Sequence, residues 1–264
     1  MISFLLAALV YTAAQGSAVQ VKVPNQPDLK SVQVMWQGKQ VPAFHAGDSW
    51  ITILGVDLDE EPGDHRAEAV LTRGDGRVER DEITISVVAK QFPTSHLKVD
   101  ERFVRLSEEN LNRVNRESKE TDAIYARITT DLFPEEEFTI PIAGGSGRNF
   151  GQRRVFNGRP RAPHSGADLR AKTGTPIHAT NRGRVVLAKP LFFTGNTVIL
   201  DHGLGIYSLY AHLSRIDVKR DEIVNNGQVV GLAGATGRVT GAHLHWAMRV
   251  QGARVDPFSL IAAP

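Results

Sequence analysis

Two histidines lie one residue apart in the stretch GAHLHW, residues 241–246. Side chains in a strand alternate between its two faces, so a strand over HLHWAMRV would project His243 and His245 from one face. Leu244 and Trp246 would then share the other face. Two neighbouring imidazoles can bind a metal ion together, or one can bind it while the other transfers protons. The alternative is two surface histidines on a half-exposed strand, because short motifs often occur by chance.

A second pair of candidate ligands occurs in HSGADLRA, where His164 and Asp168 are four residues apart around Gly166. A histidine and a carboxylate from this segment, together with a histidine from a distant strand, would form a three-ligand set of the kind that holds catalytic zinc. A loop histidine beside a capping aspartate is the alternative. His212, in YAHLS, follows an apolar stretch, and taken alone this position is more typical of a buried or edge histidine than of a catalyst.

The composition limits the kind of protein and the kind of metal site. The chain has 264 residues, of which 41% are hydrophobic and 23% charged, and this indicates a soluble globular protein of one large or two ordinary domains. A net charge of +2 is too small to indicate a nucleic-acid partner. The chain has no cysteine, which excludes disulfides and thiolate metal sites. Any metal ion must therefore be held by His, Asp or Glu.

The first 18 residues have the pattern of an export signal. An apolar run over residues 2–11 is followed by small residues that could form a cleavage site, although no Lys or Arg precedes the run. We therefore expect residues 1–18 to be a signal peptide and the mature protein to lie in the periplasm, with secretion as a second destination. A buried N-terminal strand or helix is the alternative. No other segment has transmembrane length, so we expect no stable membrane insertion.

The remainder of the chain predicts an all-β protein with a helical connector. Short alternating runs with turn signals predict a small β-sandwich over residues 19–92, for which we consider an immunoglobulin-like arrangement. Within it, Asp75-Gly76 between two apolar runs indicates a hairpin turn rather than an adhesion motif. Residues 93–137 predict a partly helical, mostly exposed connector that Ser107 could cap. Strand signals and glycines return over residues 138–264, which contain six of the nine histidines.

The three histidine-bearing motifs, taken in order, are similar to those of a known family. HSGADL, YAHLS and GATGRVTGAHLHW resemble the zinc metallopeptidases of the lysostaphin/LytM type, peptidase family M23. The stretches GTPIHATNRGRVV and NNGQVVGLAGATG fit the same framework. The resemblance covers about residues 138–260, and it implies a LytM-type β-sheet peptidase domain. The segment KRDEIVNNG departs from the family's usual turn without touching a ligand position.

The resemblance implies a role for each of five residues. His164, Asp168 and His245 would hold zinc, while His212 and His243 would lie beside the metal and transfer protons. His178 and His202 match the framework and are expected to be structural.

The resemblance also implies a substrate, the peptide stems of bacterial peptidoglycan, and the reaction, hydrolysis of a cross-link. An export signal without a wall-anchoring module favours the D,D-cross-link over a glycine bridge. A catalytically silent LytM-type module that activates another cell-wall hydrolase is the competing function. Asn157, just before the metal motif, is a further candidate for masking the cleft or touching substrate. The sequence names no protein partner.

Overall fold

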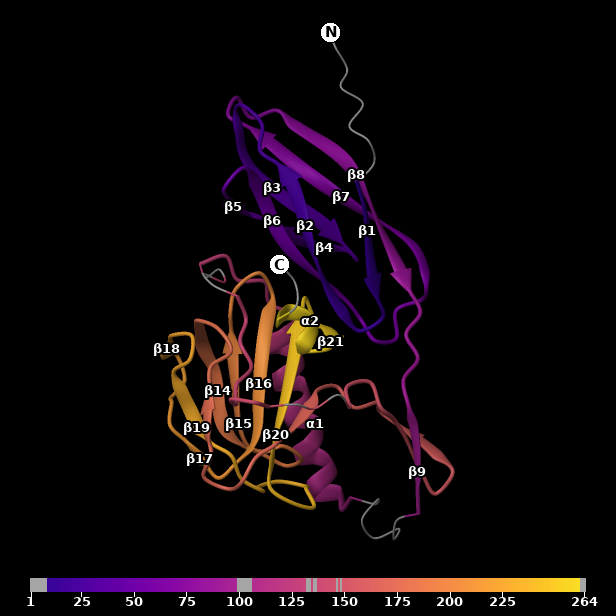
Figure 1. Ribbon diagram of the computed structural model, residues 1–264, viewed down its shortest axis with the longest axis vertical. Helices are drawn as coiled ribbons and strands as arrows, with labels where there is room; N and C mark the ends of the chain where they lie inside the picture. Colours follow the sequence, from indigo (N-terminus) through magenta and orange to yellow (C-terminus); the bar gives the residue numbers. More distant parts are fainter. Residues whose placement is uncertain are drawn as a thin grey trace.

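The computed structural model describes residues 9–98, 106–131, 134, 137–145, 147 and 149–261. Two β-sheet units are stacked along the long axis of the molecule, and one long helix lies beside the second unit (Figure 1). The expectation of an all-β protein with a helical connector is confirmed. Among the described residues, no helix has both the length and the apolar character needed to cross a membrane.

The first unit is a sandwich of two sheets. The five-stranded sheet has the order β1-β8-β7-β3-β4, and the three-stranded sheet has the order β2-β6-β5. Alternating Val, Ile and Leu side chains from both sheets form one buried core that includes Trp36. The expected hairpin is confirmed: Gly76 lies in the turn between β7 and β8 with φ +88°. The strands are β1 Leu9–Ala14, β2 Ser17–Pro24, β3 Leu29–Trp36, β4 Lys39–Pro42, β5 Phe44–Ala46, β6 Ser49–Val56, β7 Gly63–Arg73 and β8 Val78–Val88.

The division of the N-terminal strands between the two sheets can be compared with the expected immunoglobulin-like arrangement. The parallel pairing of β1 with β8 and the antiparallel pairing of β2 with β6 place the first two strands in different sheets. This grouping is consistent with an immunoglobulin-like arrangement, which stays a prediction.

Part of the segment expected to be a signal peptide is folded into the sandwich. Strand β1 pairs in parallel with β8 over its whole length, and Ala13 is buried. Cleavage after residue 18 would remove β1 and the first two residues of β2. The structure therefore shows the N-terminal strand that the sequence left as the alternative, and residues 1–8 lie outside the described part. Export stays a prediction.

The connector contains the expected helix, α1 Glu108–Tyr125. The Ser107 hydroxyl accepts a hydrogen bond of 3.2 Å from the amide of Asn110, which confirms the predicted cap. No helix residue is fully buried; near its C-terminus, Ile124 and Tyr125 pack on the second unit. The connector also contains a strand that the sequence did not predict. This strand, β9 Thr94–Leu97, pairs in parallel with β10 Arg153–Phe156, and β11 Arg159–Arg161 completes a three-stranded sheet of order β11-β10-β9.

The second unit is built on a seven-stranded sheet with the order β12-β20-β16-β15-β14-β18, and β21 pairs with β20. A three-stranded sheet of order β13-β19-β17 packs near it, and a core containing Leu169, Leu244 and Trp246 fills the interior. The elements are β10 Arg153–Phe156, β11 Arg159–Arg161, β12 Ala167–Arg170, β13 Pro176–His178, β14 Gly183–Leu191, β15 Gly195–Asp201, β16 Ile206–Leu213, β17 Arg215–Ile216, β18 Ile223–Val224, β19 Val229–Leu232, β20 His243–Val250, β21 Ala253–Val255 and α2 Phe258–Ile261.

The two units meet at the end of β20 that is far from its histidines. Gln251, which follows β20, is buried and hydrogen-bonds to the backbone of Gly55 and Ile53 in β6. The guanidinium of Arg254 pairs with Asp57. At roughly 3.4 Å per residue, the eight-residue β20 places Val250 about 24 Å from His243. The sandwich is therefore docked at a distance from the candidate metal ligands.

Candidate metal centre and proton-transfer site

Three side chains that were predicted to hold zinc converge on one point. Nε2 of His164 lies 3.1 Å from Oδ1 of Asp168, and Nδ1 of His245 lies 2.9 Å from the same oxygen. The two histidine nitrogens are 3.0 Å apart. Ligand atoms around a zinc ion with bonds of 2.0–2.1 Å are roughly 3.3 Å apart, so this set fits a zinc ion with little movement.

Strand register explains how distant segments deliver these ligands. In the antiparallel pair of β12 and β20, Asp168 lies directly opposite His245. Gly166 permits the close approach, because a Cβ atom there would lie 2.6 Å from the carbonyl oxygen of Trp246 and 2.8 Å from Cε1 of His245. The backbone of His164 is held by hydrogen bonds with Gly151 and Gln152. Leu244 and Trp246 are buried in the core, which confirms the predicted alternation along β20.

The carboxylate of Asp168 is stabilised in its charged form. Burial raises its pKa, but hydrogen bonding and charge interactions with His164 and His245 outweigh burial and hold the pKa well below its usual range. Burial lowers the pKa of His245, against the opposing hydrogen bond to Asp168. An ionised carboxylate and a neutral imidazole are the protonation states that a zinc site requires.

The two histidines predicted to transfer protons lie next to this set. The rings of His212 and His243 have centroids 4.8 Å apart, and the His212 ring is 6.0 Å from that of His245. Nδ1 of His212 lies 2.9 Å from the carbonyl oxygen of Thr236, and Nδ1 of His243 lies 2.9 Å from that of Gly241. A carbonyl oxygen only accepts, so each Nδ1 must carry the proton. In the neutral rings, Nε2 therefore carries the lone pair, and Nε2 of His243 lies 3.7 Å from Oδ1 of Asp168.

His212 reaches this position through an irregularity in its strand. In the pairing of β16 with β20, Ala211 lies opposite His245, so regular pairing would direct the next side chain to the other face. The register between β15 and β16 shifts at this point, and His212 has φ +63°. The bulge and the left-handed backbone turn the imidazole toward His243. Burial lowers the pKa of His212 to about 4, so the ring is neutral at neutral pH.

Sequence reasoning missed Asn149, which contacts two of the three candidate ligands. Its side-chain amide donates a 2.9 Å hydrogen bond to Oδ2 of Asp168, and its side-chain oxygen accepts from the Asp168 backbone amide. Its backbone oxygen accepts a 3.0 Å hydrogen bond from Nδ1 of His164. These contacts leave Oδ1 of Asp168 and Nε2 of His164 available to a metal ion. Asn149 belongs to no spaced motif, so only its position near a glycine-rich turn could have drawn attention to it.

His178 and His202 make their hydrogen-bond contacts outside the cluster of five candidate residues. His202 is fully buried between the carbonyl oxygen of Arg182, at 2.7 Å, and the hydroxyl of Ser208, at 2.8 Å. His178 contacts the carbonyl oxygen of Gly227 at 2.8 Å. Both contacts suit the structural roles expected for these residues. Asn157 lies in the turn between β10 and β11 with φ +51°.

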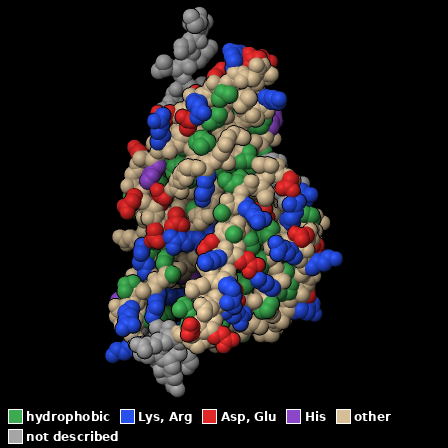
Figure 2. Space-filling model, turned by 180° about the vertical axis from the view of Figure 1, so that it is seen from behind, with side chains coloured by type: hydrophobic (Ala, Val, Ile, Leu, Met, Phe, Trp, Pro, Cys, Tyr) green, Lys and Arg blue, Asp and Glu red, His purple; other side chains and the backbone are tan. Residues whose placement is uncertain are grey.

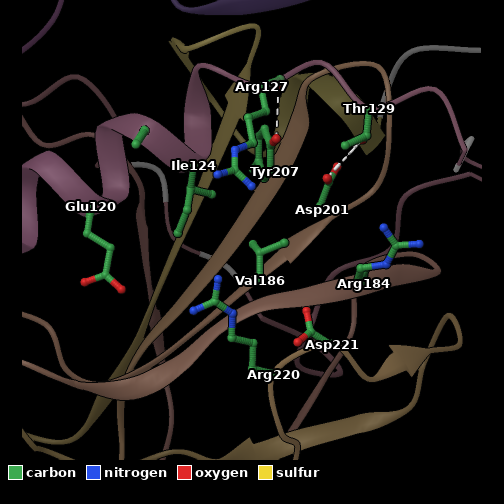
Figure 3. A pocket seen from close by; sticks show the side chains of 11 residues that line it. Glu120, Ile124, Arg127, Thr129, Arg184, Val186, Asp201, Tyr207, Arg220 and Asp221 are labelled. Carbon is green, nitrogen blue, oxygen red and sulfur yellow. Dashed lines mark hydrogen bonds between the residues drawn. The ribbon is translucent and has the colours of Figure 1, made fainter.

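A separate cavity of about 260 Å³ lies between the end of α1 and the sheet of the second unit, and none of the five candidate residues lines it. Figure 3 shows the hydroxyl of Thr129 directed at the carboxylate of Asp201, and that of Tyr207 directed at the backbone of Arg127. The Thr129 bond measures 2.9 Å, and the Tyr207 bond 3.0 Å. Burial raises the pKa of Asp201. The lining groups provide no metal-binding set, so the histidine cluster is the better candidate for chemistry.

Comparison with known proteins relates this chain to one peptidase family, both by sequence and by structure. The profile of peptidase family M23 matches residues 162–257. A crystal structure from Pseudomonas aeruginosa that carries the name peptidase M23 superposes with a TM-score of 0.72 at 31% identity, covering 95% of each chain.

Two curated relatives come from Vibrio cholerae. The peptidoglycan DD-endopeptidase ShyA is 42% identical over 109 residues, and the peptidoglycan DD-endopeptidase ShyB is 32% identical over 170 residues. These matches cover 41% and 64% of this chain. They cover only 25% and 35% of the relatives, so the chain matches about a quarter to a third of their length.

Proposed function

Because this chain belongs to peptidase family M23, we propose that it is a zinc-dependent endopeptidase that hydrolyses peptide cross-links of bacterial peptidoglycan. The observation that carries the proposal is the convergence of His164, Asp168 and His245 beside two further histidines. The D,D-cross-link is the proposed bond, and the names of the Vibrio cholerae relatives support this choice. We further propose that the protein is exported to the periplasm, where this substrate lies.

We infer a task for each of these residues in such a reaction. His164, Asp168 and His245 would hold the zinc ion, which, when bound, acts as a Lewis acid toward a peptide carbonyl and lowers the pKa of water. His212 and His243 carry their ring proton on Nδ1, so Nε2 of each ring can accept a proton during attack and return it to the leaving amine. When protonated, either ring also donates a hydrogen bond to the developing oxyanion. Asn149 keeps the Asp168 carboxylate oriented.

The test combines metal analysis with digestion of purified Gram-negative sacculi. We expect about one zinc ion per chain and conversion of dimeric muropeptides to monomers by the full chain. His245→Ala should lose both metal and cleavage, because it removes one of three ligands. A protein that binds no zinc and releases nothing from sacculi would contradict the proposal.

A catalytically silent module that activates another hydrolase remains the alternative to exclude. A silent module of this kind would have lost zinc ligands, whereas His164, Asp168 and His245 lie close together here, which supports the peptidase. Activation of a partner hydrolase that survives replacement of both His164 and Asp168 by Ala would favour the alternative. Export has its own test: N-terminal sequencing of the protein from a periplasmic extract would show whether β1 is retained.

A further inference from the structure

The hairpin of β10 and β11 carries an unusual concentration of positive charge. Its sequence, RRVFNGRPR over residues 153–161, contains four arginines and no acidic residue. Arg154 lies directly opposite Arg161 in the antiparallel register, so their side chains share one face. Like charges placed directly opposite each other destabilise a strand pair. The hairpin therefore maintains a repulsive arrangement that an anionic partner would relieve.

The described residues do not supply that partner. Arg153, on the other face of β10, pairs with Asp59 of the sandwich at 3.3 Å. Within the part of the chain that the structure describes, Arg154, Arg159 and Arg161 form no ion pair with an acidic side chain. The guanidinium of Arg161 lies 5.9 Å from the ring centre of Phe156, a contact that leaves its N–H groups available. Arg159 and Arg161 are exposed, and Figure 2 shows Lys and Arg side chains on the lobe formed by β9 to β11.

The same hairpin leads directly into the metal centre. Arg161 precedes His164 by three residues, so their Cα atoms are at most about 11 Å apart. The base of the hairpin is tied to this ligand, because the His164 amide donates to the Gln152 carbonyl and the Gly151 amide donates to the His164 carbonyl. A substrate chain that reaches the metal centre therefore passes close to the hairpin.

We propose that the face of this hairpin formed by Arg154, Arg159 and Arg161 binds the carboxylates of the peptide substrate. The proposal rests on the proposed function, because it identifies the substrate by its free carboxylate groups. A guanidinium presents paired N–H donors that match the two oxygens of a carboxylate, and a charge-assisted bond of this kind is stronger than a neutral one. The hairpin thereby selects acidic peptide stems and holds them beside the scissile bond.

The test uses the double variant Arg154→Gln/Arg161→Gln in the full chain. The matched control, Arg66→Gln/Arg77→Gln, removes two exposed charges from the sandwich. Each protein is assayed on a soluble cross-linked muropeptide with free carboxylates and on the same muropeptide with amidated carboxylates. We expect the hairpin variant to raise KM for the free-carboxylate substrate about tenfold with little change in kcat, corresponding to the loss of one charged hydrogen bond. The control and the amidated substrate should show no such change.

The test also includes folding controls and a replacement variant. Zinc content and the unfolding midpoint establish that the variants are folded. If the glutamine pair fails to fold, Arg154→Lys/Arg161→Lys replaces it, and its charge without the planar fork should give a smaller rise in KM. An unchanged KM, or an equal rise with both substrates, would overturn the proposal while leaving the peptidase function intact.

A binding assay distinguishes failure of the proposed peptidase function from failure of the proposed carboxylate site. Cosedimentation with purified sacculi, before and after amidation of their carboxylates, does not depend on cleavage. If the wild type cleaves no peptidoglycan but loses sacculus binding on amidation and in the hairpin variant, the proposed function fails and the carboxylate site stands. If the hairpin variant loses binding to phosphatidylglycerol vesicles but not to sacculi, the face contacts a membrane surface and the proposal fails.

Discussion

The ring of His212 lies 4.8 Å from that of His243, although regular pairing of their two strands would direct the side chains to opposite faces. The bulge and the left-handed φ of +63° at His212 bring the two rings together. Backbone conformations of this kind cost free energy and persist where the surrounding structure enforces them. Here the enforced feature is a pair of imidazoles beside the candidate metal ligands.

This pairing predicts that both histidines act on protons and not on the metal. His212→Ala and His243→Ala should each lower kcat/KM by about 10² to 10⁴, because each removes one proton-transfer group. Zinc content should stay near one per chain in both variants. His178→Ala is the control and should retain activity, because the His178 ring contacts the Gly227 carbonyl and belongs to neither the candidate ligand set nor the histidine pair. Loss of zinc from either variant would mean that its histidine is a ligand.

Asn149 should control metal affinity through the orientation of two ligands. Asn149→Ala removes the amide that donates to Asp168, and loss of such a supporting hydrogen bond typically weakens metal binding by about 10- to 100-fold. Asn149→Asp has the same shape but presents an oxygen to the Asp168 carboxylate, so it should weaken binding at least as much. Chelator competition would measure both. Asn25→Ala, in the sandwich, should leave the affinity unchanged, and wild-type affinity in Asn149→Asp would rule out this role.

The buried His202 should make the stability of the metal-free protein depend on pH. Burial lowers its pKa to about 4 from the ordinary 6.5, so between these values the unfolded chain binds a proton that the folded chain does not. Stability should therefore fall as the pH falls from 6.5 to 4, by about 3 kcal/mol from this residue. Urea unfolding at a series of pH values would measure this. His202→Gln should be less stable at pH 7 but should show a weaker pH dependence; an unchanged slope would assign the effect to other groups.

Gln251 should hold the two units together without affecting catalysis. Its amide nitrogen donates to the carbonyl oxygens of Ile53 and Leu204, and its amide oxygen accepts from the Gly55 backbone. Gln251→Ala leaves these buried groups without their partner, which should lower the free energy of unfolding by at least about 2 kcal/mol.

The catalytic consequence of the same change should be small. Gln251 follows the end of β20 that lies far from His243, so kcat/KM of the folded variant at 25 °C should match the wild type. A large loss of activity with zinc still bound would show that the interface and the active site are coupled. Gln251→Glu, which keeps the shape but loses the donor, should destabilise the protein in the same way.

Several features of the site could be predicted from the sequence because they depend on composition or on residues that are close together in the chain. The spacing of His243 and His245 already placed both on one face of a strand, and Leu244 on the other. The absence of cysteine limited the metal donors to His, Asp and Glu. The Ser107 cap and the Asp75-Gly76 turn were likewise predictable, since caps and turns depend on a few consecutive residues.

Only the tertiary structure decided which distant segments meet. Asp168 faces His245 across 77 residues of sequence, and Asn149 reaches both Asp168 and His164 from outside any motif. The bulge that turns His212 depends on pairing with two neighbouring strands at once, and β1 joins the sandwich only by lying beside β8. Local preferences determine the alternation and turns of each segment, whereas register and strand order are set by the burial of a shared core.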